Sequence, residues 1–68
     1  MKSVSGRVFC RALERAGWTI VRVSGSHHIY EQASRPRHLS VPVHGNKDLA
    51  PGLLRRLLKD AELSEGDL

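Results

Sequence analysis

The sequence contains one cysteine and no long apolar run. Cys10 cannot form a disulfide within the chain, and no Cys-x-x-Cys pair offers a zinc site. The apolar segments 8–10 and 18–21 are each interrupted within a few residues, which excludes a membrane span and the core of a signal peptide. We therefore expect a soluble protein of the reducing cytoplasm that has no membrane partner.

Acidic residues are scarce outside the C-terminal end. The 68 residues include 11 Lys and Arg against 7 Asp and Glu, a formal net charge of +4. Four of the acids lie in the last nine residues, namely Asp60, Glu62, Glu65 and Asp67. The rest of the chain is therefore more basic still, which suits a polyanionic partner such as nucleic acid. At this length we expect a single domain, residues 1–68, in which 63–68 form a frayed acidic tail.

Residues 4–16 are predicted to form a first helix. Apolar side chains recur there at three- and four-residue spacing and make one stripe, formed by Val8, Phe9, Ala12, Leu13 and Ala16. Ser3 or Ser5 can cap its start, and Gly17 stands where a left-handed C-terminal cap favours glycine. The helix is therefore expected to end at Gly17.

Three strands are predicted next, over 18–23, 27–32 and 38–43. The first two are joined by Ser24-Gly25-Ser26, which favours a tight antiparallel hairpin. Residues 33–37 form the next turn, because Pro36 disfavours a helical Arg35. Apolar and polar side chains alternate along 38–43, and Pro42 cannot donate to a ladder, so this strand is expected at an edge.

A second helix is predicted to begin at Pro51. Its apolar stripe is formed by Leu53, Leu54, Leu57, Leu58 and Ala61, and Arg55, Arg56 and Lys59 form a basic face on the other side. This basic face is either a solvated surface or a surface that contacts phosphates. The order helix, three antiparallel strands, helix predicts a two-layer α+β fold with both helices on one face of the sheet.

Two adjacent histidines follow Gly25-Ser26 at the mouth of the second strand. Imidazole donates and accepts protons near neutral pH, so a histidine in this place is a candidate acid or base, although exposed histidines are also common as plain surface. Side chains alternate along a strand, so His27 shares a face with Ile29, and His28 shares the other face with Tyr30. The pattern alone leaves open which of the two faces is the open one.

Several segments, in this order and spacing, resemble the HicA-type toxins of bacterial and archaeal toxin-antitoxin pairs, which are small mRNA interferases. The resemblance covers roughly residues 4–63. It is carried by Gly17-Trp18, Gly25-Ser26-His27-His28-Ile29-Tyr30, Val41-Pro42-Val43-His44, Asn46-Lys47-Asp48-Leu49, and Gly52-Leu53-Leu54-Arg55 continuing into Leu58-Lys59-Asp60-Ala61.

The resemblance implies a fold like the double-stranded-RNA-binding domain and ribonuclease activity centred on His27, the first histidine after Gly-Ser. It also implies a HicB-type antitoxin that binds the toxin and covers its active site. We expect the isolated toxin to be a monomer that acts on mRNA. The sequence departs from the family at 32–37, which lacks an Asp-Gly-like turn, and at Glu62, which replaces a usual glycine. Both departures concern a turn and a helix end and leave the histidine untouched.

RNA carries its own nucleophile, the ribose 2′-hydroxyl, so the protein has to position the phosphate, transfer protons and offset negative charge. We predict that His27 is the general base or acid, with His28 as the alternative and His44 as a weaker candidate for the second proton transfer. No metal or cofactor is expected. The residues predicted to contact RNA are Arg22, Ser26, His28, Lys47, Arg55 and Arg56.

Other functions fit the sequence less well. A non-catalytic RNA-binding module explains the charge and the fold order but gives His27 no role. A zinc protein would have to use Cys10, His27, His28, His38 and His44, whose spacing matches no tetrahedral site. DNA binding by the isolated chain is disfavoured because no helix-turn-helix pattern is present.

Overall fold

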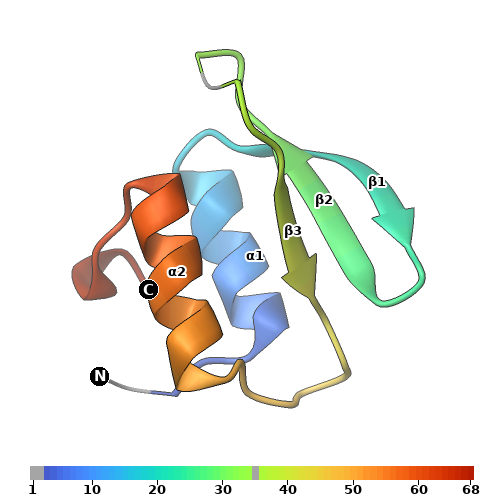
Figure 1. Cartoon of the computed structure of the whole chain (residues 1–68), viewed down its shortest axis with the longest axis vertical. Coiled ribbons are helices and arrows are strands. Elements are labelled where there is room, and N and C mark those ends of the chain that lie inside the picture. Colours follow the sequence, from blue (N-terminus) through green and yellow to red (C-terminus); the bar gives the residue numbers. More distant parts are fainter. Residues whose placement is uncertain (1–2, 35) are drawn as a thin grey trace.

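The computed structural model describes residues 3–34 and 36–68, which form a two-layer α+β domain (Figure 1). Along the chain the elements are α1 (Gly6–Arg15), β1 (Thr19–Ser24), β2 (His27–Glu31), β3 (Leu39–Pro42), α2 (Pro51–Ala61) and a short 3-10 turn, η1 (Glu65–Asp67). The strands form one antiparallel sheet in the order β1-β2-β3, and both helices pack on one side of it. The predicted fold class and element order are confirmed. Arg35, in the predicted turn 33–37, lies outside the described residues.

The two ends of α1 follow from local sequence. The Ser5 hydroxyl accepts a hydrogen bond from the backbone N–H of Val8 at 3.2 Å, so Ser5 is the cap. At the other end Gly17 has φ +97°, a left-handed conformation that glycine adopts without steric cost. The Trp18 N–H then donates to the Leu13 carbonyl at 2.9 Å, which closes a Schellman turn. The predicted stop at Gly17 is confirmed.

The core lies between the sheet and the helices. Its buried apolar side chains come mainly from α1, α2, β2 and β3 and from the segment before β1, and they include Phe9, Leu13, Trp18, Tyr30, Val41, Leu54 and Leu57. The predicted alternation along the third strand is confirmed at its centre, since Leu39 and Val41 are buried while Ser40 is exposed. This strand is also an edge of the sheet, as Pro42 indicates. β1 contrasts with it, because all six of its residues are exposed.

The first turn of α1 touches the end of β3 at Gly6. A side chain at this position would collide with the Pro42 carbonyl oxygen and would lie 3.2 Å from the Val43 Cα atom. Only glycine allows this close approach, which fixes where α1 begins relative to the sheet. The contact joins residues far apart in the chain, so it has no signal in the local pattern of the sequence.

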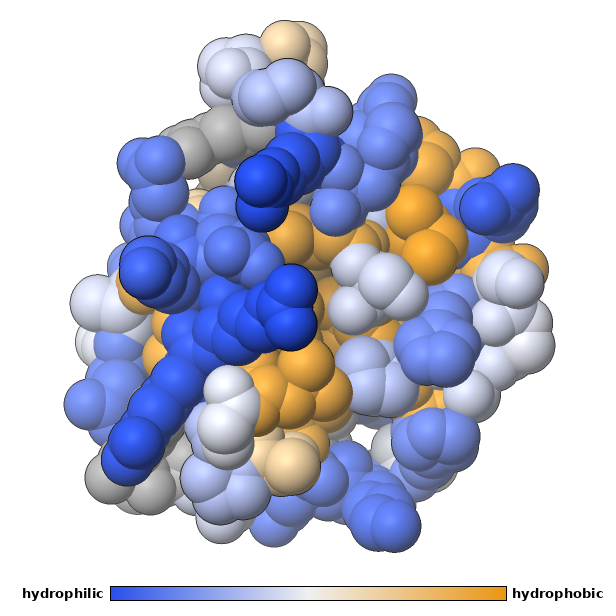
Figure 2. Space-filling model, in the orientation of Figure 1, coloured by the Kyte–Doolittle hydropathy of each residue, from blue (hydrophilic) through white to orange (hydrophobic). Residues whose placement is uncertain are grey.

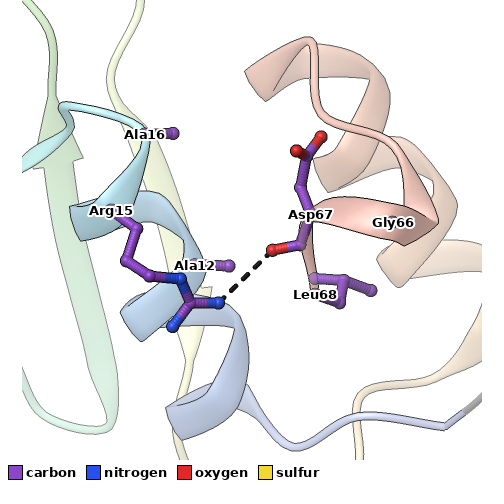
Figure 3. A pocket seen from close by; sticks show the side chains of 6 residues that line it. All are labelled: Ala12, Arg15, Ala16, Gly66, Asp67 and Leu68. Carbon is purple, nitrogen blue, oxygen red and sulfur yellow. Dashed lines mark hydrogen bonds between the residues drawn. The ribbon is translucent and has the colours of Figure 1, made fainter.

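The C-terminal residues are ordered, and the prediction of a frayed tail is wrong. Ser64 and Asp67 form a capping box around η1, and Leu63 and Leu68 pack against the core. Arg15 reaches across from α1 and donates to the Asp67 carbonyl oxygen at 3.3 Å (Figure 3). The acidic composition had indicated a solvated segment, but two apolar side chains and this contact hold the segment against α1.

Glu62 ends α2 in the left-handed conformation, with φ +56° and ψ +40°. The Leu63 N–H donates to the Leu58 carbonyl at 2.9 Å, the same closing bond that ends α1. A residue with a Cβ atom is disfavoured in this conformation. The chain therefore ends α2 in this conformation at Glu62 without the glycine that favours it.

Replacing Gly6 by alanine is expected to lower the free energy of unfolding by about 1–3 kcal/mol, the usual cost of overpacking. The helix propensity of alanine works in the opposite direction by about 1 kcal/mol. Gly52→Ala is the matched control, because Gly52 lies in the first turn of α2 and a Cβ atom there meets nothing within 4 Å. Urea unfolding of both variants measures the difference. Equal stabilities would contradict the close approach at Pro42.

Candidate active site

His27 and His28 lie on opposite faces of the sheet. Tyr30 is 1% exposed and packs in the core, so the helix-covered face of β2 carries Tyr30 and the half-buried His28. His27 and Ile29 therefore lie on the open face, and His27 is exposed. The structure thus decides the alternative that the alternation pattern had left open. His27 stands at the first position of β2, between Ser24 on β1 and Pro42 on β3.

Tyr30 is the residue that fixes this orientation. Its hydroxyl donates a hydrogen bond of 2.8 Å to the Glu14 carboxylate on α1, so the buried ring is tied to the helix layer at its polar end. Burial raises the pKa of the Tyr30 hydroxyl, and hydrogen bonds with Cys10 and Glu14 raise it further. Burial also raises the pKa of the Cys10 thiol, so this cysteine is held as an inert core residue.

A β-bulge at Val21 turns Arg22 onto the face that carries His27. Ile20 pairs with Tyr30, and the register shifts so that Arg22 pairs with Ile29. Without the extra residue, Arg22 would stand opposite His28 and share the helix-covered face. Because cross-strand partners share a face, Arg22 lies on the open face, diagonal to His27 at a spacing of about 7–8 Å. The structure thus brings together two of the predicted site residues.

The loop after β3 places two more predicted residues near His27, the first residue of β2. Pro42, the partner of His27, lines a hollow of about 190 Å³ together with His44 and Lys47. The Lys47 N–H donates to the His44 carbonyl at 3.0 Å, which closes a tight turn, and both side chains are exposed. Ser26 adjoins this loop through its backbone, since its carbonyl accepts from the Val43 N–H at 2.7 Å.

Arg55 and Arg56 lie in the other layer of the molecule. Both are exposed on α2, and the Arg56 Nε atom is 4.0 Å from the Asp60 carboxylate. Figure 2 shows strongly hydrophilic side chains across the face of α2 that is turned to the viewer. The structure does not bring these arginines onto the face that carries His27. They form a separate basic surface on the helix layer.

Sequence reasoning did not identify the open-face pair of His38 and Glu31 as part of a site. The His38 Nε2 atom lies 3.2 Å from a Glu31 carboxylate oxygen, and both side chains are more than half exposed. The alternation of side chains along the strands could have indicated this pair. Glu31 lies two residues from Ile29, and His38 lies two residues from Ser40, the partner of Ile29. Once Tyr30 is known to be the buried residue on β2, this alternation places Glu31 and His38 on the open face.

Within residues 3–34 and 36–68, no three His, Cys, Asp or Glu side chains lie close enough together to hold a metal ion. Over the same residues, no helix is long and apolar enough to cross a membrane.

These observations define a small basic α+β domain that presents a histidine on the open face of its sheet. A family model described as the HicA toxin of bacterial toxin-antitoxin matches residues 6–63, so the chain belongs to the HicA toxin family. It is therefore the toxin of a toxin-antitoxin system, and its family implies an antitoxin partner. No curated protein matches the chain.

Tyr30 is expected to make the free energy of unfolding depend on pH in the alkaline range. Its pKa is raised by folding, so the unfolded chain loses this proton first, and stability is expected to fall as the pH rises above about 10. Tyr30→Phe loses the bond to Glu14 and is expected to be less stable by about 1 kcal/mol at neutral pH. Above pH 10 this difference should narrow by up to about 1.4 kcal/mol per pH unit.

Denaturant unfolding of both proteins between pH 8 and about 11 measures this response, in the range where an ordinary tyrosine ionises. Both proteins carry Cys10→Ala, because the pKa of the Cys10 thiol depends on its hydrogen bond with Tyr30. A stability difference that stays constant across the range would show that Tyr30 ionises equally in the folded and unfolded states.

Proposed function

We propose that this toxin is an endoribonuclease that cleaves mRNA, with His27 as its general acid or base, and that a HicB-type antitoxin neutralises it. The observation that supports the proposal is the position of His27, exposed on the open face of the sheet in a protein of the HicA family. A histidine needed only for packing would stand on the other face, as His28 does. The ordered sheet holds the His27 backbone, while the imidazole remains accessible to a large substrate.

The proposed reaction uses the ribose 2′-hydroxyl of the substrate as its nucleophile. In this mechanism His27 removes the 2′-hydroxyl proton, the 2′-oxygen attacks the adjacent phosphorus, and the bond to the 5′-oxygen breaks. The products are a 2′,3′-cyclic phosphate and a 5′-hydroxyl. Arg22, diagonal to His27, supplies positive charge to the phosphate as negative charge develops on its oxygens.

A second proton-transfer group has to protonate the leaving 5′-oxygen. His44 and Lys47 border the hollow beside Pro42, the strand partner of His27, so they adjoin the same end of β2. Lys47 suits a phosphate contact because its ammonium is a flexible point charge. His44 suits the proton transfer because an imidazole ring can both donate and accept a proton.

His27→Ala is expected to reduce RNA cleavage by the purified protein at least about 100-fold, the lower end of what a general acid or base contributes. Cleavage by the unmodified protein should persist in a metal chelator, since neither the 2′-hydroxyl nor the imidazole needs a metal ion. End analysis of the fragments and single-turnover rates measure both properties. Arg11→Ala is the control, because it changes an exposed α1 side chain on the helix layer.

Two other results would each contradict the proposed histidine mechanism. A protein that shifts RNA in a gel and leaves it intact would be the non-catalytic RNA-binding module. Fragments with 5′-phosphate ends, or cleavage abolished by chelation, would replace the histidine mechanism with a metal-dependent one. Co-expression of the neighbouring antitoxin gene should restore the growth of cells that express the active toxin.

A further inference from the structure

The open face of the sheet contains a hollow of about 450 Å³. Its lining consists of Val21 and Arg22 on β1, Ile29 on β2, and His38 just before β3. Ile29 is half-buried and lies on the central strand of the sheet. Its cross-strand partners are Arg22 on β1 and Ser40 on β3. The hollow therefore has an apolar floor with a cation at one side and an imidazole at the other.

The β-bulge forms one wall of this hollow. Val21 is the extra residue, and it lines the same hollow as Arg22, the next residue along the chain. In a regular strand consecutive side chains point to opposite faces, so only the bulge allows both to border one hollow. Val21 is 45% exposed, so it presents an apolar contact surface at this wall of the hollow.

The opposite wall is oriented by the pair of His38 and Glu31. A carboxylate only accepts hydrogen bonds, so the His38 Nε2 atom bonded to Glu31 carries the hydrogen. When the ring is neutral, its Nδ1 atom is therefore an acceptor, and in either state the ring face is a stacking surface. Glu31 thereby orients His38 and is not itself among the residues that line the hollow.

The hollow adjoins the proposed catalytic residue. Ile29 and His27 are two residues apart on the same face of β2, a distance of about 7 Å along the strand. That is close to the reach of one nucleotide. A phosphate held at His27 therefore has its neighbouring base within range of the hollow.

We propose that this hollow is a nucleobase subsite: it holds one unpaired base next to the cleaved phosphate, with the base against Ile29 and Val21 and the ring of His38. The inference rests on the proposed ribonuclease function and names the part of the RNA that the open face recognises. Arg22 contributes a charge contact with the RNA backbone or a stacking contact with the base. A base inside a duplex could not enter the hollow, so the subsite selects single-stranded RNA.

A protein partner fits the hollow less well, because the described residues that line it are few, with one cation and one imidazole beside two apolar side chains. Duplex RNA would instead meet a broad surface through phosphate contacts, for which the arginines on α2 are placed. The subsite and the α2 surface therefore make different predictions about which side chains matter for cleavage of an unpaired strand.

The test is single-turnover cleavage of a short unstructured RNA by the full chain, with protein in excess and varied in concentration. His38→Ala and Val21→Asp are expected to raise the half-saturating protein concentration about tenfold each, the scale of one stacked base. They should also redistribute the cleavage positions along a mixed-sequence RNA. Arg11→Ala is the matched control on the other layer, and thermal unfolding confirms that the exposed substitutions leave the fold intact.

Half-saturation and cleavage positions that match those of Arg11→Ala in both variants would overturn the subsite. So would a preference for duplex RNA that only Arg55→Ala and Arg56→Ala weaken. If the unmodified chain cleaves no RNA, the proposed function fails and the subsite is tested separately. In that case, fluorescence anisotropy of a labelled single-stranded oligonucleotide bound to the same variants is measured, and equal affinities would again overturn it.

Discussion

The burial of Tyr30 is the constraint from which the arrangement of the site follows. Side chains along β2 point alternately to the two faces of the sheet, so placing one of them in the core determines the direction of all the others. Tyr30 is held there by the surrounding apolar side chains and by its hydrogen bond to Glu14 on α1. His27, three positions away, must then face solvent. A shift of one residue in the register would bury His27 and expose Tyr30.

The bulge in β1 is the second constraint, and it determines on which face of the sheet the positive charge of Arg22 lies. It lets Ile20 stand opposite Tyr30 and Arg22 stand opposite Ile29, so an arginine joins His27 on the open face. The remaining predicted cations are distributed over the loop at Lys47 and the outer surface of α2. The positive charge of the chain is thus divided between two layers. The proposed chemistry uses the sheet layer, where the histidine is.

The sequence predicted the features that depend on nearby residues. Gly17 marked the end of α1, Gly25 marked the hairpin, and Pro42 marked an edge strand, because each acts through its own backbone. It did not predict features that depend on packing between distant segments. The contact of Gly6 with Pro42, the extra residue in β1 and the docking of Leu68 each need the folded neighbours. The choice of the open face belongs to this second group, and the roles of the predicted site residues remain predictions.

Chemical rescue tests the central claim, that the imidazole of His27 transfers a proton from the open face. Replacing His27 by alanine leaves a space open to solvent, since the side chain is exposed. Added imidazole should therefore restore cleavage by His27→Ala in proportion to its concentration, with the same cleavage positions as the unmodified protein. If His27→Ala binds RNA as tightly as the unmodified protein but imidazole restores nothing, His27 does not transfer the proton, and the assignment of the active site is wrong.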